Sequence, residues 1–311
     1  MSTRLFFSGT PSLTSQQKYT LGSMIKRRLN SCHGDYMREA MLWGAVISQP
    51  ESTIDEWMLD SGAFTAWSRG DDVTLDGVIE RYDRVMATMT RTDVKVWLIN
   101  LDVIPGSRGV DPTAQQLDDA MRQSDINFEI LVKRYGPCVL PVFHQGESEA
   151  RLEAVKQQAT YIGVSPRNDL PEKVRVTWAA QVHTLLGKTR SHGLAATGDV
   201  MVRTVPWWSV DSASWLYTAA MGGITIMMNG KLVKLSMSDR SPNIKDLGEH
   251  FDTLPAVQRD MVVGKIAAAG LTVEGLRTSA NQRVFFCAIE NQRWADAVSC
   301  SGHVQESLFA L

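Results

Sequence analysis

Polar side chains follow four short apolar runs of this sequence, at the points where those runs end. The residues concerned are Asp60 and Ser61 after Trp57–Leu59, Asp102 after Val96–Leu101, His144–Glu147 after Cys138–Phe143, and Asp211 after Val205–Val210. Apolar runs of this length are typical of buried parallel strands, and the carboxyl ends of parallel strands carry the chemistry of α/β folds. We therefore expect the three carboxylates and the Gln145 amide to line one polar pocket. Carboxylates in such a pocket can act as a nucleophile or as a general acid and base.

The same acids also have a purely structural interpretation. Asp and Ser are good N-cap residues, and each of these acids lies at an expected turn from strand to helix. Asp211 and Ser212, just ahead of Ala213, fit such a cap. The recurrence of acids at successive run ends, together with Gln145–Gly146, favours the functional interpretation.

Apolar runs alternate with helical segments along most of the chain. The strands that we expect are Phe6–Gly9, Trp57–Asp60, Val94–Asp102, Val139–Phe143, Tyr161–Val164, His192–Ala195, Trp208–Val210 and Gly223–Met227. The helices that we expect are Ser15–Leu29, Leu75–Met89, Pro112–Tyr135, Glu147–Gln158, Pro171–Leu186 and Ser212–Met221. This alternation predicts an α/β fold, a (β/α)8 TIM barrel. An open doubly wound sheet is the competing architecture, but no Gly-x-Gly-x-x-Gly motif follows the first strand.

The C-terminal part of the chain follows a different pattern. The turn dipeptide Asn229–Gly230, between Ile226–Met228 and Leu232–Leu235, predicts a β-hairpin. From about Asn243 onward the pattern is helical. We therefore expect a TIM-barrel domain over residues 1–235 and a helical extension, packed on the barrel, over residues 236–311.

The composition is that of an ordinary globular protein. The chain has 311 residues and a formal net charge of −2, and it lacks the roughly 18 consecutive apolar residues of a membrane span. We expect no membrane partner and a cytoplasmic location. The net charge argues against non-specific coating of nucleic acid, although Arg167, Lys231 and Lys234 can contribute to a local basic groove. The four cysteines are scattered and form no Cys-x-x-Cys pair, so we expect no bound metal and no other cofactor.

The segment Asp60–Phe64, which reads Asp-Ser-Gly-Ala-Phe, resembles the Asp-Ser-Gly-Gly-Phe box of the tRNA-guanine transglycosylases. Further segments resemble later motifs of that family in the same order, so that the resemblance covers about residues 55–225. Those segments are Leu101–Asp102, Phe143–Gly146, Tyr161–Val164, His192–Ala195 and Val210–Ser212. The resemblance implies that Asp211 is the nucleophile and Asp60 the general acid/base. It also implies a set of residues that bind a purine base, namely Asp102, Gln145, Gly146, Gly163, Val164, Ser61 and Phe64.

The chain departs from the tRNA enzymes after the barrel. Those enzymes carry a Cys-x-Cys-x-x-Cys plus His zinc site there, which Cys287, Cys300 and His303 do not reproduce. A short form without zinc is similar to the phage and bacterial branch of the family that inserts 7-deazaguanines into DNA. The resemblance then implies that a guanine flipped out of duplex DNA is replaced by a free 7-deazaguanine base through a covalent Asp-glycosyl intermediate.

Other activities are compatible with the same features. A tRNA-guanine transglycosylase would share the whole set of residues, and a barrel N-glycosidase or nucleoside hydrolase would use the same carboxylates with water as the acceptor. A non-catalytic nucleic-acid-binding barrel is harder to reconcile with three intact acids. His144 and His192 fit either the lining of the pocket or a neutral position in the core.

Overall fold

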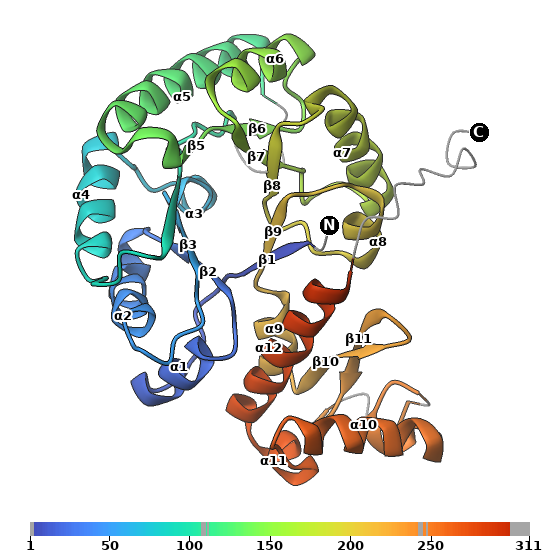
Figure 1. Cartoon of the computed structure of the whole chain (residues 1–311). Helices are drawn as coiled ribbons and strands as arrows, with labels where there is room; N and C mark the ends of the chain where they lie inside the picture. The colour runs from blue at the N-terminus through green and yellow to red at the C-terminus, as the bar shows by residue number, and fades with distance from the viewer. Residues whose placement is uncertain (1–2, 107–109, 111, 242–244, 247, 299–311) are drawn as a thin grey trace, which may run out of the picture.

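Parallel strands form the centre of the molecule, whose computed structural model describes residues 3–106, 110, 112–241, 245, 246 and 248–298. Within that part, a sheet of nine strands has the order β5-β4-β3-β2-β1-β9-β8-β7-β6, and its pairings are parallel. The strands are β1 (Arg4–Phe7), β2 (Arg27–Ser31), β3 (Glu56–Asp60), β4 (Lys95–Ile99), β5 (Val139–Leu140), β6 (Val142–His144), β7 (Tyr161–Ser165), β8 (Arg190–Gly193) and β9 (Ser209–Ser212). Figure 1 shows them curled into a ring with helices around it.

Pro141 joins the two edges of this sheet. It alone separates β5 from β6, and it has no backbone N–H to donate to a strand ladder. On one side the Leu140 carbonyl accepts from the Asn100 N–H at 2.8 Å, and on the other the Pro141 carbonyl accepts from the Gly163 N–H at 2.8 Å. β5 and β6 therefore act as one strand that closes the sheet. The predicted α/β fold, a TIM-like barrel, is confirmed.

Helices cover the outside of the barrel and build the C-terminal part. They are α1 (Ser15–Gly22), α2 (Met37–Ile47), α3 (Ala63–Arg69), α4 (Leu75–Met86), α5 (Ala114–Tyr135), α6 (Glu149–Gln158), α7 (Glu172–Leu186), α8 (Asp199–Thr204), α9 (Ser214–Ala220), α10 (Ala256–Ala268), α11 (Val273–Thr278) and α12 (Ala280–Ala297). Thr14 and Thr113 begin α1 and α5 with capping boxes, in which the Thr hydroxyl and a Gln three residues later satisfy two free backbone N–H groups.

The predicted helix Ser15–Leu29 is wrong in its second half. Helix α1 ends at Gly22, and Arg27–Ser31 forms strand β2 of the barrel. The run did not look like a strand because two of its buried positions are polar. Arg28 is fully buried, stacks on the Trp43 ring at 4.4 Å and donates to the Phe7 and Gly9 carbonyls. Asn30 accepts from the Trp57 indole N–H at 3.0 Å. Paired in this way, polar side chains replace the apolar pattern of a buried strand.

The predicted eighth barrel strand, Gly223–Met227, is also wrong. These residues belong to β10 (Gly223–Met228), which pairs in antiparallel fashion with β11 (Lys231–Ser236) in a separate two-stranded sheet. Because β2 already supplies the missing strand, the barrel is complete without β10. The hairpin around Asn229–Gly230 is confirmed, and Asn229 has the positive φ of +49° that such a turn requires.

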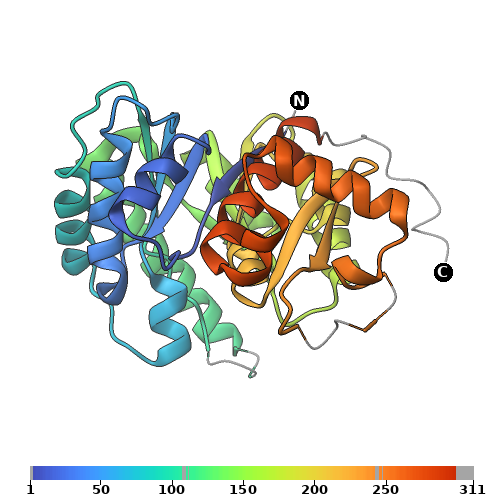
Figure 2. The same cartoon turned by 90° about the horizontal axis from the view of Figure 1, so that it is seen from below.

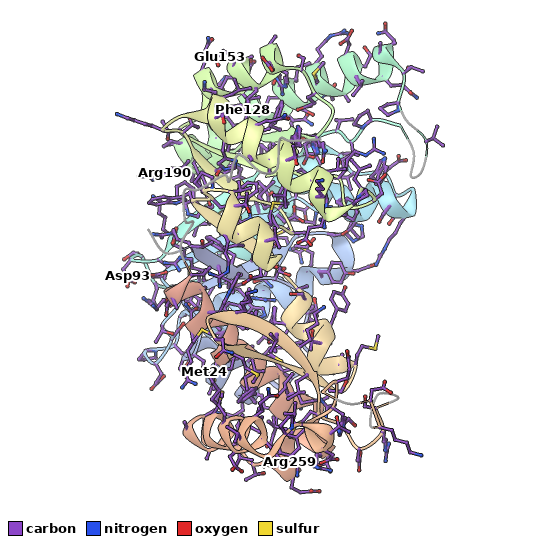
Figure 3. The ribbon with its side chains drawn as sticks, turned by 90° about the vertical axis from the view of Figure 1, so that its right-hand side faces the viewer. Met24, Asp93, Phe128, Glu153, Arg190 and Arg259 are labelled. Atoms are coloured by element: carbon purple, nitrogen blue, oxygen red, sulfur yellow. The ribbon has the colours of Figure 1, made fainter. Side chains whose placement is uncertain are left out.

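Helix α12 covers the barrel next to β1, although it comes last in the described chain. Asn281 near its start donates to Gln17 of α1, and the Lys26 N–H ahead of β2 donates to Gln292 near its end. Figures 1 and 2 show α12 between the barrel and the hairpin, with α10 farther out. In Figure 3, Glu153 on α6 and Arg259 on α10 mark opposite ends of the molecule. The division into residues 1–235 and 236–311 stays a prediction; β11 runs across it.

Side chains fill the inside of the barrel. The middle layer is apolar and consists of Phe6, Leu29, Met58, Trp97, Ile99, Leu140, Val142 and Tyr161. Toward the amino-terminal strand ends, the buried carboxylate of Glu56 pairs with Arg27 at 2.7 Å and accepts from the Trp97 indole N–H at 2.9 Å. The interior is therefore a packed core, and the carboxyl ends of the strands are left for chemistry.

Candidate active site

Three carboxylates gather at the carboxyl ends of the barrel strands. Asp60 is the last residue of β3, Asp211 lies on β9, and Asp102 follows shortly after β4. Asp102 and Asp211 are each 8% exposed. Both lie near enough to Asp60 for their charges to raise the pKa of its carboxyl. The strand ends thus bring together the acids that the sequence assigned to one pocket.

The Asp60 carboxyl is the titratable group of this cluster. Burial raises its pKa to about 7, the charges of Asp102 and Asp211 act in the same direction, and hydrogen bonds from the Gly62 N–H and the Ser31 hydroxyl oppose the rise. Gly62 has a φ of +85°, and a Cβ there would lie 2.8 Å from the Cβ of His33, so this tight turn strongly favours glycine. A carboxyl that titrates near neutral pH suits a general acid that later acts as a base.

Asp211 is held through one of its two oxygens. Its Oδ1 accepts from the Ala195 N–H at 2.8 Å, and the His192 Nε2 lies 3.5 Å from the same atom. Ala195 has a φ of +53°, which is uncommon for a residue with a side chain and turns its amide toward the carboxylate. No hydrogen bond within the described residues engages Oδ2. Asp211 is therefore fixed in place with one oxygen left to react.

Asp102 is paired with a histidine. The His144 Nε2 lies 2.7 Å from the Asp102 Oδ2, and the His144 N–H donates to Glu147 at 2.9 Å. Burial lowers the pKa of His144, but the hydrogen bond and the charge of Asp102 outweigh it and raise the pKa above its ordinary value. Burial also raises the pKa of Glu147. Only the Oδ1 of Asp102 is then left to receive hydrogen bonds from a base.

Gln145, Gly146 and Arg167 lie together on the rim, in the loops after β6 and β7. The Gln145 side-chain oxygen accepts from the Arg167 N–H at 3.0 Å, which leaves its amide NH2 as the group that can donate to a ligand. Gly146 is exposed and has a φ of +112°. The Arg167 guanidinium pairs with Asp169 at 2.7 Å. The rim therefore offers a donor from Gln145 and a cation that already has an acidic partner.

The structure does not place Lys231 beside these residues. Lys231 begins β11, next to the hairpin tip, and the Gly230 carbonyl at that tip accepts from Arg203 at the end of α8. Helix α8 runs from the carboxyl end of β8 back to the amino end of β9, so its last residues lie toward the opposite rim of the barrel. The hairpin tip next to Lys231 therefore lies away from the carboxyl-end rim, and the contribution of Lys231 and Lys234 to a basic groove stays a prediction.

The remaining predicted base-binding residues differ in what they can offer. Ser61 is fully buried and its hydroxyl donates to the Asn100 carbonyl at 3.1 Å, while the Gly163 N–H is used in the sheet by Pro141. Val164 is fully buried among the helices that cover the barrel. Phe64, on α3, is 59% exposed, and its ring lies 5.8 Å from that of Trp67. Of these residues, only Phe64 presents an open surface for stacking.

An open groove of about 410 Å³ lies beside Asp102. It runs between α3, the segment after β4 and the face of α5. Its lining residues are Ala63, Ala66, Trp67, Asp71, Val73, Thr74, Leu75, Leu101, Asp102, Val103, Ile104, Gln123 and Asn127. The Trp67 indole donates to the Gly106 carbonyl at 2.9 Å, which fixes one wall. The lining includes Asp102 but neither Asp60 nor Asp211, so the groove adjoins only one of the three carboxylates.

The described residues contain no group of three or more His, Cys, Asp or Glu side chains that could hold a metal ion. Cys287 is fully buried and its sulfur accepts from the Thr225 N–H, while Cys300 and His303 lie outside the described residues. Within the described part of the chain, no helix has the length and hydrophobicity to cross a membrane.

Several residues that shape the site were not singled out from the sequence. Ser31 belongs to β2, which was not predicted from the sequence. The Ala195 amide points at Asp211 because Ala195 has an unusual positive φ. Ser209 is hydrogen-bonded to the His192 Nδ1 from inside the barrel, and the Tyr161 hydroxyl is hydrogen-bonded to Ser209. The period of two along β2, β7 and β9 is the signal that places such residues on the inner face.

Comparison with models of known protein families and with curated protein sequences finds no match to this chain.

Proposed function

We propose that the protein is a base-exchange transglycosylase that replaces guanine in DNA with a 7-deazaguanine. The observation that supports this best is the division of labour between two neighbouring carboxyls. Asp60 has a pKa of about 7, and Asp211 is anchored through Oδ1 with Oδ2 free. Retaining exchange at a glycosidic carbon needs this combination of a proton donor that can reverse its role and a carboxylate nucleophile.

The reaction follows from these two groups. The Asp211 Oδ2 attacks C1′ of the nucleoside, the bond from C1′ to the guanine nitrogen breaks, and protonated Asp60 supplies a proton to the departing base. The product is a glycosyl ester on Asp211 and an ionised Asp60. Asp60 then takes the proton from the ring nitrogen of the incoming base, that nitrogen attacks C1′, and the bond to Asp211 breaks. Two inversions give net retention.

Base recognition falls to the groups that remain available around this centre. The Asp102 Oδ1 can accept from the N–H groups of a guanine edge, and the Gln145 amide can donate to its carbonyl oxygen. The exposed Phe64 ring on α3 offers the base a stacking surface. Ser61 and Gly163, whose donors are used inside the protein, have no part in this proposal.

A base inside a duplex cannot reach the end of a barrel, so the target guanine has to be flipped out of the helix. The choice of DNA over tRNA rests on the resemblance of the short, zinc-less chain to the DNA-modifying branch. The net charge of −2 favours modest binding to a polyanion with a strong dependence on salt. Arg167, whose backbone N–H is hydrogen-bonded to Gln145, is the predicted nucleic-acid contact on this rim.

The decisive experiment measures incorporation of labelled guanine into duplex DNA, single-stranded DNA and tRNA side by side. We expect labelled duplex DNA with the wild-type protein and no label with Asp211→Asn. The matched control is Asp93→Asn, which changes an exposed carboxylate paired with Arg91 and should exchange as well as wild type. Preferential labelling of tRNA would overturn the choice of DNA. Release of free base without incorporation would instead establish the hydrolase, with water as the acceptor.

A further inference from the structure

Three polar side chains form a buried chain inside the barrel, directly beneath Asp211. The Tyr161 hydroxyl lies 2.5 Å from the Ser209 Oγ, and the Ser209 Oγ lies 2.7 Å from the His192 Nδ1. Tyr161 is 4% exposed, and Ser209 and His192 are fully buried. The other ring nitrogen of His192, Nε2, has no hydrogen-bond partner among the residues that the structure describes, and it lies 3.5 Å from the Asp211 Oδ1. The chain leads from the middle of the barrel to the proposed nucleophile.

The protons of these three side chains have two possible arrangements. If Tyr161 donates to Ser209 and Ser209 donates to the Nδ1 of His192, then Nε2 carries the imidazole proton and presents it to Asp211. In the opposite arrangement the Tyr161 proton has no acceptor among the described residues, and a bare Nε2 lone pair faces a carboxylate. Each arrangement leaves one donor without a hydrogen bond, but the first turns an N–H toward the Asp211 carboxylate and the second a lone pair, so electrostatics favours the first.

We propose that His192 is a positioning residue for Asp211, held as the neutral Nε2–H tautomer by Ser209 and Tyr161. This inference rests on the proposed function, and it assigns the two oxygens of Asp211 different tasks. Oδ1 is held by the Ala195 N–H and faced by the His192 N–H, so Oδ2 is the atom that bonds to the sugar. When the glycosyl ester forms, Oδ1 becomes its carbonyl oxygen and keeps both donors.

His183, a second histidine bonded to a serine, provides a comparison within the same protein. Its Nδ1 lies 2.7 Å from the Ala179 carbonyl, which can only accept, and its Nε2 lies 2.7 Å from the Ser191 Oγ. His183 must therefore be the Nδ1–H tautomer when neutral. Ser191 and Ser209 are a matched pair, since each is a buried serine bound to a histidine, but only Ser209 belongs to the series of hydrogen bonds that ends at Asp211.

Nitrogen NMR of the full-length protein with labelled histidine tests the tautomer without any assumption about activity. We expect His192 as the Nε2–H form and His183 as the Nδ1–H form. Ser209→Ala should leave His192 in a mixture of tautomers, and Asp211→Asn should shift its Nε2–H proton signal. An Nδ1–H form of His192 in the wild type, or a signal that does not respond to Asp211→Asn, would overturn the proposal.

Base exchange gives the second readout. Ser209→Ala should lower the rate of Asp211 adduct formation, and hence kcat, by about tenfold or more while leaving KM unchanged, because a donor aimed at the reacting group acts mainly in the transition state. Tyr161→Phe should have a smaller effect in the same direction. Ser191→Ala should leave kcat at the wild-type value. Equal losses in Ser209→Ala and Ser191→Ala would reduce the chain to a structural role. If the wild type exchanges no base at all, the proposed function fails, and the NMR result alone decides whether His192 positions Asp211.

Discussion

Asp60 links the chemistry of the site to the stability of the whole chain. Its ordinary pKa is 3.8, whereas burial and the neighbouring carboxylates raise it to about 7 in the folded state. Between these values the folded protein binds a proton that the unfolded chain has released, so stability falls as the pH rises and the loss is complete above about pH 7. Ionisation of Asp60 therefore lowers the free energy of unfolding of the protein.

We accordingly predict that Asp60→Asn stabilises the protein above pH 7 by about 1–3 kcal/mol, because an amide carries no charge to desolvate. The gain should shrink as the pH falls toward 4. Urea unfolding of the two proteins at several pH values measures it, with Asp93→Asn as control, whose carboxyl has its pKa lowered by Arg91 and should show no gain. A gain that does not depend on pH would contradict the assignment.

The Asp102–His144 pair can be tested separately. Asp102 opposes the lowering of the His144 pKa by burial, so Asp102→Asn should bring that pKa below its ordinary value of 6.5. The same substitution should alter base preference in the exchange reaction. An NMR titration of His144 follows the first effect, with His183, whose pKa burial lowers to about 4, as an unaffected reference. A His144 pKa that stays raised would show that Asp102 is not its partner in solution.

At the scale of single elements, the turn from β3 into α3 determines where Asp60 points. Gly62→Ala combines a left-handed φ of +85° with a clash against His33, so we predict a loss of about 1–3 kcal/mol in unfolding free energy. Gly70→Ala, at the other end of α3, is the matched control. It has a φ of +72° but nothing within 4 Å of its Cβ, and it should cost less. Equal losses would mean that the close approach to His33 is relieved cheaply.

Some of these elements could be predicted from the sequence and others could not. Periodicity and strand-end acids predicted the barrel and the gathering of Asp60, Asp102 and Asp211, because an apolar run that ends in an acid is a local signal. Strand β2 was not predicted because two of its buried residues, Arg28 and Asn30, are polar. Their partners are Trp43, Trp57 and the backbone, and these contacts cannot be inferred from the neighbouring sequence. The pairings of Asp102 with His144 and of Ser61 with Asn100 join separate strands and depend on the three-dimensional register.

At the scale of the molecule, one buried carboxylate ties the hairpin to the helices around it. Glu290 of α12 is fully buried, pairs with Lys265 of α10 and Arg293, and accepts from the Met227 N–H of β10. We predict that Glu290→Gln lowers the free energy of unfolding by about 1–2 kcal/mol, because Lys265 and Arg293 lose their charged partner while remaining partly exposed to water. Glu274→Gln, on the surface of α11, should have little effect. Calorimetry measures both variants. A wild-type stability in Glu290→Gln would show that hydration of Lys265 and Arg293 replaces the lost ion pairs.

The place of α12 in the chain sets the order in which a newly made molecule can finish folding. All the strands of the barrel have been synthesised by residue 212, but the helix that covers β1 begins only at residue 280. Ribosomes add about 5–20 residues per second, so α12 reaches β1 several seconds after the barrel strands are complete. During that interval the nascent chain exposes part of the apolar outer face of β1, which can associate with other apolar surfaces.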